Sequence, residues 1–315
     1  MAPVGVPFGA ALLSLALDLC FGEPPARLHP VVAMGRYLNL KGALLARARR
    51  PRARLAAGFG FVALGAALSG GLAWGVQRGA QRLPDPARRP LLACALAPLF
   101  SVRALLTAGG AVRDALAAGD LTAARRLLGW HLVSRETAGL TPSEVAGAAV
   151  ASLAENLTDS ITAPLLYAAA FGLPGAAVYR FVNTADAVLG YRTPALEHFG
   201  RAAARADDLL SFVPARLSGG LLLLALTLAG GDARAAWRGL KRDARRTPSP
   251  NGGVTMALAA AGLGVRLEKR GVYVLNAAGR APTAADIGRA QQLVGAALGL
   301  GMLGWWLLGS ARARA

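Results

Sequence analysis

Long apolar runs are the feature that most restricts how this chain can fold. Each run approaches the about 20 residues that a helix needs to cross the hydrocarbon core of a bilayer, with about 17 as the lower limit. The runs occupy roughly residues 5–21, 55–74, 91–107, 161–179, 213–229 and 291–308. The sequence therefore predicts an all-α, polytopic integral membrane protein, with four to six membrane helices plus amphipathic and cytosolic helices.

Positive charge gathers in the loops between these runs. The formal net charge is +18, with eight Lys and Arg between residues 22 and 54, eleven between 231 and 290 and four between 75 and 90. No face of aromatic side chains accompanies them, so we exclude a nucleic-acid partner. Basic loops beside apolar spans follow the positive-inside pattern, which predicts that 22–54 and 231–290 are cytoplasmic. Residues 31–54 are predicted to form one amphipathic basic helix on the membrane surface.

The amino-terminal run is interpreted as a retained helix. It has neither a basic segment nor a small-residue cleavage site, and Asp18 interrupts it. Cys20 and Cys94 fit neither a disulfide framework nor the spacing of a metal site. Both cysteines are predicted to be core residues.

The stretch from Ser152 to Arg216 concentrates acidic residues within this basic chain. Six of the 17 carboxylates fall here against five arginines, so the stretch carries −1 while the rest of the chain carries +19. An unpaired charge is costly to bury, so these carboxylates must be paired, solvated or bound to a cation. They are Glu155, Asp159, Asp186, Glu197, Asp207 and Asp208. This stretch is the first candidate for a functional site.

A polar stripe is predicted on the helix that the Thr141–Glu144 capping box opens. At 100° per residue, Ser152, Glu155, Asn156 and Asp159 lie on one side of an otherwise apolar helix. Glu155 and Asp159 are like charges at i,i+4, which repel unless something positive lies between them. Mg²⁺, which prefers oxygen ligands, would suit this position. The alternative is a structural partner, namely Arg180, Arg201 or Arg205.

The loop from Asp18 to Pro30 supplies a second group of candidates. Its prolines forbid continued helix, so the loop presents Glu23 and His29 rigidly at a membrane boundary. We expect it to lie over the same site as Asp159. A lone histidine in a loop is more often an ordinary surface residue.

Four more polar segments follow, each with a structural alternative. The first segment is His131–Thr137, which contains Arg135, and the second has Asn183 and Asp186 on one helical face, followed by Gly190-Tyr191. The third is the helical row of Arg201, Arg205 and Asp208, and the fourth is the turn Thr247–Gly253, which contains Ser249 and Asn251. The segment His131–Thr137 could simply join two helices. The row of Arg201, Arg205 and Asp208 could form an intrahelical ion pair that contributes little to stability. The turn could hold a phosphate with its backbone N–H groups or be an ordinary loop. No standard glycine-rich nucleotide motif is present, so any nucleotide binds differently.

The topology of the acidic segment stays open. If every apolar run spans the membrane, residues 181–212 lie opposite to the basic loops. Either 161–179 or 213–229 is then re-entrant, or the acidic segment folds into a cavity within the membrane, where polar groups are tolerated. We predict a single membrane-embedded domain, 1–315, in which the polar segments 18–36, 131–216 and 247–253 converge.

Taken together and in order, these motifs resemble those of the adenosylcobinamide-phosphate synthases, membrane proteins of cobalamin biosynthesis. The matching segments are Gly22-Glu-Pro with His29-Pro, Gly119-Asp-Leu, Ser-Arg135-Glu-Thr, Glu155-Asn with Asp159, Asn183-Thr with Asp186 and Gly190-Tyr, Ala204-Arg-Ala-Asp-Asp208 with Pro-Ala-Arg216, and Ser249-Pro-Asn-Gly. The resemblance covers nearly the whole chain. Glu136 stands where the family usually has Asp, and Ala187 where it usually has Ser.

The resemblance implies an ATP- and Mg²⁺-dependent amide ligation. The propionate of adenosylcobyric acid would be joined to (R)-1-amino-2-propanol O-phosphate, or to the free amino alcohol, through an acyl phosphate. On this basis Glu155 and Asp159 are assigned to the metal, and Asp186, Asp208, His29 and Arg205 to catalysis. The residues assigned to substrate binding are Glu23, Arg135, Asn183, Tyr191, Asp207, Arg216, Ser249 and Asn251.

The same resemblance implies a place in the bacterial inner membrane, with the active site facing the cytoplasm and other cobalamin-pathway membrane proteins as possible neighbours. The alternative function is a transporter or a corrinoid-binding scaffold that uses the intramembrane carboxylates for ion coupling. The sequence has no inverted repeat that would favour a transporter.

Overall fold

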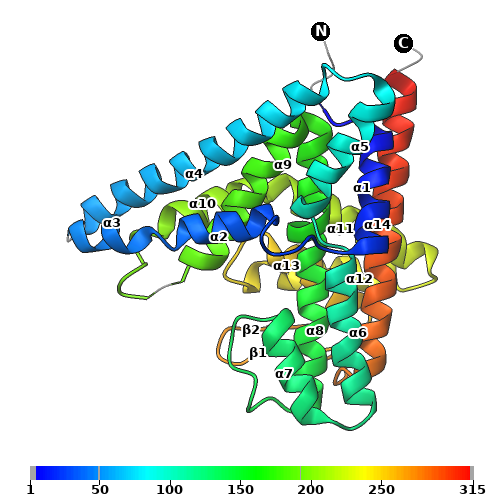
Figure 1. Cartoon of the computed structure of the whole chain (residues 1–315). Helices are drawn as coiled ribbons and strands as arrows, with labels where there is room; N and C mark the ends of the chain where they lie inside the picture. Colours follow the sequence, from blue (N-terminus) through cyan, green and yellow to red (C-terminus); the bar gives the residue numbers. More distant parts are fainter. Residues whose placement is uncertain (1–4, 49, 192, 313–315) are drawn as a thin grey trace. The chain divides into compact units, whose positions relative to one another are not determined.

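The computed structural model describes residues 5–48, 50–191 and 193–312, most of which are helical (Figure 1). Contacts between Cα atoms divide the chain into two compact units. Unit 1 comprises Met1–Ser101 and Ala163–Ser211, and unit 2 comprises Val102–Thr162 and Phe212–Ala315. The predicted all-α class is confirmed. The predicted convergence of the polar segments in one domain stays a prediction.

Unit 1 is built around the packing of two long helices, α4 and α9. Its elements are α1 (Phe8–Phe21), α2 (Pro30–Leu38), α3 (Lys41–Arg47), α4 (Pro51–Ala80), α5 (Asp85–Leu96), η1 (Ala97–Leu99), α9 (Ala163–Leu189) and α10 (Arg201–Leu210). Helices α2 and α10 pack on α9, and α1 packs on α5. An aromatic cluster fills the contact between α2, α4 and α9: the ring of Tyr37 stacks on Phe61 at 4.5 Å and meets Phe181 edge-on at 5.7 Å.

Helix α9 bends at one residue. Gly172 has φ 74° and ψ −164°, a conformation that favours glycine, and Pro174 follows it. The bend frees the N–H of Leu173, which donates to the buried side-chain oxygen of Gln77 in α4 at 2.7 Å. A backbone donor buried without water needs such a partner. The apolar run 161–179 therefore contains a kink within a helix at Gly172.

Unit 2 surrounds the nearly fully buried helices α8 and α13. Its elements are α6 (Arg103–Ala117), α7 (Leu121–His131), α8 (Pro142–Asn156), the π-helical segment η2 (Leu157–Thr162), α11 (Phe212–Leu228), α12 (Ala233–Asp243), η3 (Ala244–Arg246), α13 (Gly252–Gly262), a hairpin of β1 (Leu267–Lys269) and β2 (Tyr273–Leu275), and α14 (Ala284–Arg312). Helices α6, α13 and α14 pack on α8. The hairpin pairs Leu267 with Leu275 and Lys269 with Tyr273.

Four helical stretches are long and apolar enough to cross a membrane. They are Pro51–Ala80, Asp85–Ala117, Pro142–Leu189 and Ala284–Ser310, and the bent pair Arg201–Leu210 with Phe212–Leu228, at 46°, adds a fifth if it forms one broken span. The predicted run 5–21 forms the shorter helix α1. The predicted run 161–179 continues the helix that starts at Pro142. The count lies within the predicted range.

Two sequence predictions are wrong. Residues 31–54 do not form one helix, because α2 ends at Leu38 and Pro51 opens α4. Arg50, which precedes that proline, is extended with φ −87° and ψ 146°, as the proline ring requires. Cys20 and Cys94 are exposed instead of buried in the core. Their helices present apolar surface outward, so apolar sequence context did not indicate burial.

Close approach of backbones on α4 yields a stability prediction. A Cβ atom at Gly58 would lie 2.1 Å from the carbonyl oxygen of Phe199, whereas one at Gly60 would meet nothing within 4 Å. We expect Gly58→Ala to destabilise the protein by about 1–3 kcal/mol through overpacking. Thermal unfolding in detergent micelles, compared with the matched variant Gly60→Ala on the same helix, measures this. Equal midpoints for the two variants would contradict the packing described.

Candidate functional site

The capping box that opens α8 places Glu155 at the far end of that helix. The Oγ1 atom of Thr141 accepts from the Glu144 N–H, and the Glu144 carboxylate accepts from the Thr141 N–H at 2.7 Å, as predicted. Fourteen positions after Thr141, the Glu155 side chain is half-buried. Its Oε1 atom would lie 2.5 Å from a Cβ atom at Gly252. The Glu155 carboxylate therefore lies against the first residue of α13.

The polar stripe continues past Glu155 into a π-helical segment. The helix changes from α to π after Asn156, so Asp159 lies in η2. Ser152 donates to the carbonyl of Leu132 at 2.8 Å, Asn156 to the carbonyl of Ser152 at 3.0 Å, and Ser160 to the side chain of Asn156 at 2.8 Å. The polar row thus runs along Ser152, Asn156 and Ser160. Short π-helical segments are rare and frequently mark functional sites.

The predicted turn at residues 247–253 forms a folded loop joined to α11. Thr247 Oγ1 donates to the carbonyl of Ser249, and Ser249 Oγ accepts from the N–H of Asn251. Asn251 is buried, and its side-chain oxygen accepts from Arg216, which also donates to the carbonyl of Pro250 at 3.2 Å. Unit 2 therefore brings together three predicted residues, Arg216, Ser249 and Asn251. Glu155 lies beside the residue that follows Asn251.

Sequence analysis did not identify Tyr273, which the hairpin carries toward the same place. Its hydroxyl donates to the Sδ atom of Met256 at 3.6 Å. Burial raises the pKa of Tyr273 to about 12. The Glu155 carboxylate also raises this pKa, and the Arg135 guanidinium lowers it. Tyr273 thus stays protonated near neutral pH and is a hydrogen-bond donor. Arg135, a predicted substrate residue, is close enough to act on the same phenol.

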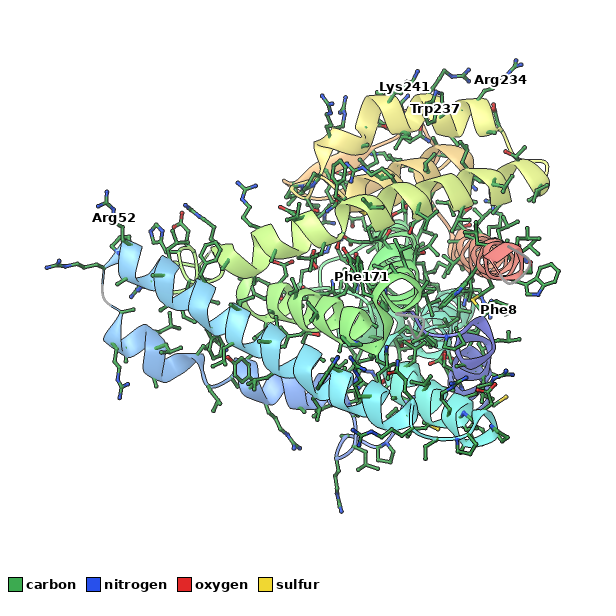
Figure 2. All side chains as sticks on the ribbon, turned by 90° about the horizontal axis from the view of Figure 1, so that it is seen from above. Phe8, Arg52, Phe171, Arg234, Trp237 and Lys241 are labelled. Carbon is green, nitrogen blue, oxygen red and sulfur yellow. The ribbon has the colours of Figure 1, made fainter. Side chains whose placement is uncertain are left out.

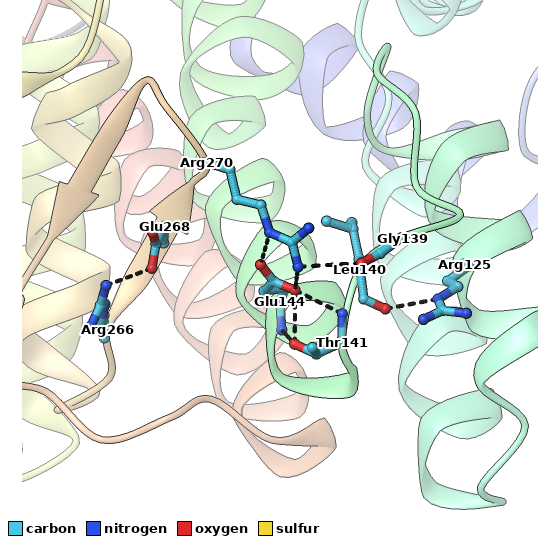
Figure 3. A network of polar contacts seen from close by, with 8 residues as sticks. All are labelled: Arg125, Gly139, Leu140, Thr141, Glu144, Arg266, Glu268 and Arg270. Atoms are coloured by element: carbon cyan, nitrogen blue, oxygen red, sulfur yellow. Dashed lines mark hydrogen bonds and ion pairs between the residues drawn. The ribbon is translucent and has the colours of Figure 1, made fainter.

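An ion pair fastens the hairpin to the start of α8 (Figure 3). Arg270, in the turn of the hairpin, donates to both oxygens of Glu144 and to the carbonyl of Gly139 at 3.2 Å. The same carboxylate belongs to the capping box. The tip of the hairpin and the first turn of α8 therefore share one acceptor, which helps to hold the strand that carries Tyr273.

Unit 1 contains a second polar cluster where α9 meets α10. Asn183 donates to Asp207 at 3.2 Å, and Asp186 lies close enough to Asp208 for their charges to interact. A Cβ atom at Gly190 would lie 2.2 Å from Oδ1 of Asp186, so the glycine leaves room for that carboxylate. The other two predicted residues, Arg205 and Tyr191, are exposed. The structure brings four of these six predicted residues together.

The third cluster lies in the loop before α2. Glu23 accepts from Ser101 at 2.9 Å, and its carboxylate is 3.7 Å from Nε2 of His29. Nδ1 of His29 accepts from the N–H of Val31 and so caps α2, which leaves the proton of neutral His29 on Nε2, facing Glu23. Burial lowers the pKa of His29, and Arg180 lowers it further, against the opposing effect of Glu23.

The donor set suits a magnesium ion that arrives with phosphate. Within the described residues no group of three or more His, Cys, Asp or Glu side chains could hold a metal by itself. Mg²⁺ in nucleotide sites is usually held by one or two carboxylates, with phosphate oxygens and water completing its octahedron. Glu155 and Asp159 supply carboxylates of that kind, so they fit a magnesium–nucleotide complex better than an isolated ion.

The capping role of His29 yields a pH prediction. Because the pKa is lowered in the folded state, the unfolded chain binds more protons between the folded value and 6.5. Stability should therefore fall as the pH falls below about 6.5 through the folded pKa. Thermal midpoints in detergent from pH 7.5 to 5 measure this. The variant His29→Asn keeps a capping side chain, and its thermal midpoint should no longer fall with pH through this effect. The control variant His131→Asn should keep the same fall of the midpoint with pH as the wild-type protein. An unchanged slope in His29→Asn would refute the assignment.

Comparison with known proteins assigns the chain to a family. A model of the CobD/Cbib protein family matches residues 11–294. A relative named probable cobalamin biosynthesis protein CobD, from Methanothermobacter thermautotrophicus, is 42% identical over 269 residues, which cover 84% of this chain and 85% of the relative. Cobalamin biosynthesis protein CobD of Geobacter metallireducens is 41% identical over 267 residues, covering 84% and 83%. No solved structure matches the chain. The chain is therefore a member of the CobD/Cbib family of cobalamin biosynthesis proteins.

Proposed function

We propose that this protein is an ATP-dependent ligase that forms the amide bond of adenosylcobinamide phosphate. It would join the propionate carboxyl of adenosylcobyric acid to the amine of (R)-1-amino-2-propanol O-phosphate, or of the free amino alcohol. Family membership supports the pathway. The observation that carries the reaction class is the position of Glu155 against the Asn251–Gly252 turn, with Arg135 and Arg216 nearby in unit 2. This arrangement supports the proposal, because a carboxylate that could bind a metal lies near guanidinium groups that could bind phosphate.

The proposed reaction has two steps. A carboxylate oxygen of the propionate attacks the terminal phosphorus of ATP, which forms an acyl phosphate and releases ADP. The amine nitrogen then attacks the acyl carbon, the C–O bond to phosphate breaks, and inorganic phosphate leaves with the electron pair. When bound, Mg²⁺ supplies positive charge to the ATP phosphates, and Glu155 and Asp159 would hold it. Arg216, with Arg205 as a second candidate, would neutralise charge that develops during transfer.

The amine must lose protons before and during its attack. Carboxylates that interact as Asp186 and Asp208 do are suited to bind an ammonium and accept its proton. His29 is the alternative base, since its lowered pKa keeps it neutral at pH 7, and it would accept the proton on Nδ1 after releasing the N–H of Val31. Asn183 and Asp207 would orient the first pair, and Glu23 would orient His29. Tyr191 is exposed and would contact the substrate only at the edge of the site.

The protein would lie in the cytoplasmic membrane of a bacterium, with the site open to the cytosol. Helix α12 supports this orientation. Figure 2 shows Arg234, Trp237 and Lys241 extending from its outer side, and Lys241 lies 5.2 Å from the Trp237 ring. A basic helix with an aromatic residue suits the anionic inner leaflet. Other cobalamin-pathway membrane proteins are the partners that we would expect there.

Turnover in detergent micelles tests the reaction and the metal site together. With ATP, Mg²⁺ and both substrates, the wild-type protein should form amide and ADP in equal amounts. Asp159→Asn should raise the Mg²⁺ concentration needed for half-maximal rate at least about tenfold, as expected for a lost metal contact. Asp114→Asn, at an exposed carboxylate in the same unit, is the control.

Two outcomes would contradict these assignments. An unchanged rate and Mg²⁺ requirement in Asp159→Asn would remove Asp159 from the metal site. Absence of amide product from the wild-type protein, combined with corrinoid uptake into liposomes that contain it, would indicate a transporter instead of a ligase.

Site-directed labelling tests the orientation. In a background with Cys20→Ser and Cys94→Ser, cysteines are introduced by Ala187→Cys and Ala206→Cys beside the α9–α10 cluster. We expect membrane-impermeant maleimide to label both only from the cytoplasmic side, as it should label Arg234→Cys on α12. Bound corrinoid should shield the first two. Their labelling from the periplasmic side of intact cells would show that the acidic segment faces outward.

A further inference from the structure

We infer that Tyr273 is a phosphate-binding residue, whose hydroxyl donates a hydrogen bond to an anionic oxygen of a ligand held beside Glu155. The choice of ligands rests on the proposed function, which supplies two phosphate-bearing candidates. They are the Mg²⁺ complex of ATP and (R)-1-amino-2-propanol O-phosphate. No sequence motif pointed to this residue.

The first observation is an underused donor. Tyr273 is half-buried, and tyrosine hydroxyls withdrawn from water usually find a good acceptor. In the structure, Tyr273 donates to the thioether of Met256 at 3.6 Å, and sulfur of this kind is a weak acceptor. A phosphate oxygen would be a much stronger one, because hydrogen bonds to charged groups contribute more than those between neutral groups.

The second observation places that donor beside Glu155. Gly252 and Met256 are one turn apart on α13 and share a face of the helix. A Cβ atom at Gly252 would lie 2.5 Å from Oε1 of Glu155 and 3.3 Å from Cε of Met256. The end of the Met256 side chain therefore lies near the Glu155 carboxylate, and its Sδ atom accepts from the Tyr273 hydroxyl. Residues from α8, α13 and β2 meet at this point.

The third observation concerns charge. Tyr273 senses the carboxylate of Glu155 and the guanidinium of Arg135 together, so both charged groups lie near its phenol. A neutral donor near a carboxylate and a guanidinium suits a ligand that brings both phosphate and a divalent cation. The phosphate would face Arg135 and Tyr273, while the cation would face Glu155. With its phenol protonated near neutral pH, Tyr273 would bind without acting as a base.

The hairpin gives the donor a fixed position. Arg270 at the tip holds Glu144, and Asn276 after β2 accepts from Arg242 and donates its N–H to the buried Asp243 at 2.8 Å. The strand that carries Tyr273 is thus fastened on both sides. The position of its hydroxyl is therefore fixed by contacts made on either side of the strand.

Binding measurements on the full-length protein in detergent micelles test the inference. Calorimetry gives Kd for Mg²⁺ with a non-hydrolysable ATP analogue, for (R)-1-amino-2-propanol O-phosphate and for the free amino alcohol. Tyr273→Phe should raise Kd about tenfold or more for one phosphate ligand, the loss expected for a hydrogen bond to a charged group. A loss confined to the analogue identifies the nucleotide. A loss for the phosphorylated but not the free amino alcohol identifies the second substrate.

Two control variants separate binding from structure. Met256→Leu removes the sulfur acceptor at similar volume. It should leave the Kd values of the two phosphate ligands unchanged, because Met256 accepts the hydrogen bond of Tyr273 only when no ligand is bound. Tyr37→Phe removes a hydroxyl that donates to the carbonyl of Phe61 in unit 1 and should also leave them unchanged. Thermal midpoints confirm that each variant is folded.

Each outcome decides one question. Kd values within twofold of wild type in Tyr273→Phe, equal losses in Met256→Leu, or a wild-type protein that binds neither phosphate ligand would overturn the inference. A wild-type protein that binds a phosphate ligand in a Tyr273-dependent manner but forms no amide would overturn the ligase proposal and leave the role of Tyr273 standing.

Discussion

Polar groups inside this apolar chain must find partners within the protein, and this requirement organises much of the structure. The N–H freed by the kink at Gly172 is bound by Gln77, and the carbonyl that follows α7 accepts from Ser152. Asn251 is held by Arg216 and Asp243 by Arg242. In water each group could be solvated individually. In a membrane helix protein, an unsatisfied group costs several kcal/mol, so each polar position commits a second residue elsewhere in the fold.

Features set by local chemistry could be predicted from the sequence. The start of α8 follows from the Thr141 capping box, and that of α7 from the Asp120 side chain, which accepts from the N–H of Ala123. Apolar runs located the membrane helices, because hydrophobic length is a property of a single segment. Asn183 bonds to Asp207, and Arg216 bonds to Asn251. All four residues were candidate site residues in the sequence analysis because they are polar residues in an apolar chain.

Other features depend on distant contacts and could not be predicted in this way. The change from α to π geometry after Asn156 has no local breaker in the sequence, and the bond from Ser160 to Asn156 within it was not predicted. Tyr273 lies more than a hundred residues from Glu155, so nothing in either segment pointed to the other. Exposure of Cys20 and Cys94 escaped prediction because a helix facing lipid has the same composition as one facing a core.

The double role of Glu144 has a consequence for how unit 2 opens and closes. One carboxylate completes the cap of α8 and also anchors Arg270 of the hairpin. Fraying of the helix start would therefore release the hairpin, and detachment of the hairpin would weaken the helix start. The two elements, joined by residues 126 positions apart in the chain, should behave as one cooperative unit. Their backbone amides would then exchange with solvent deuterium through a common opening event, at a common free energy.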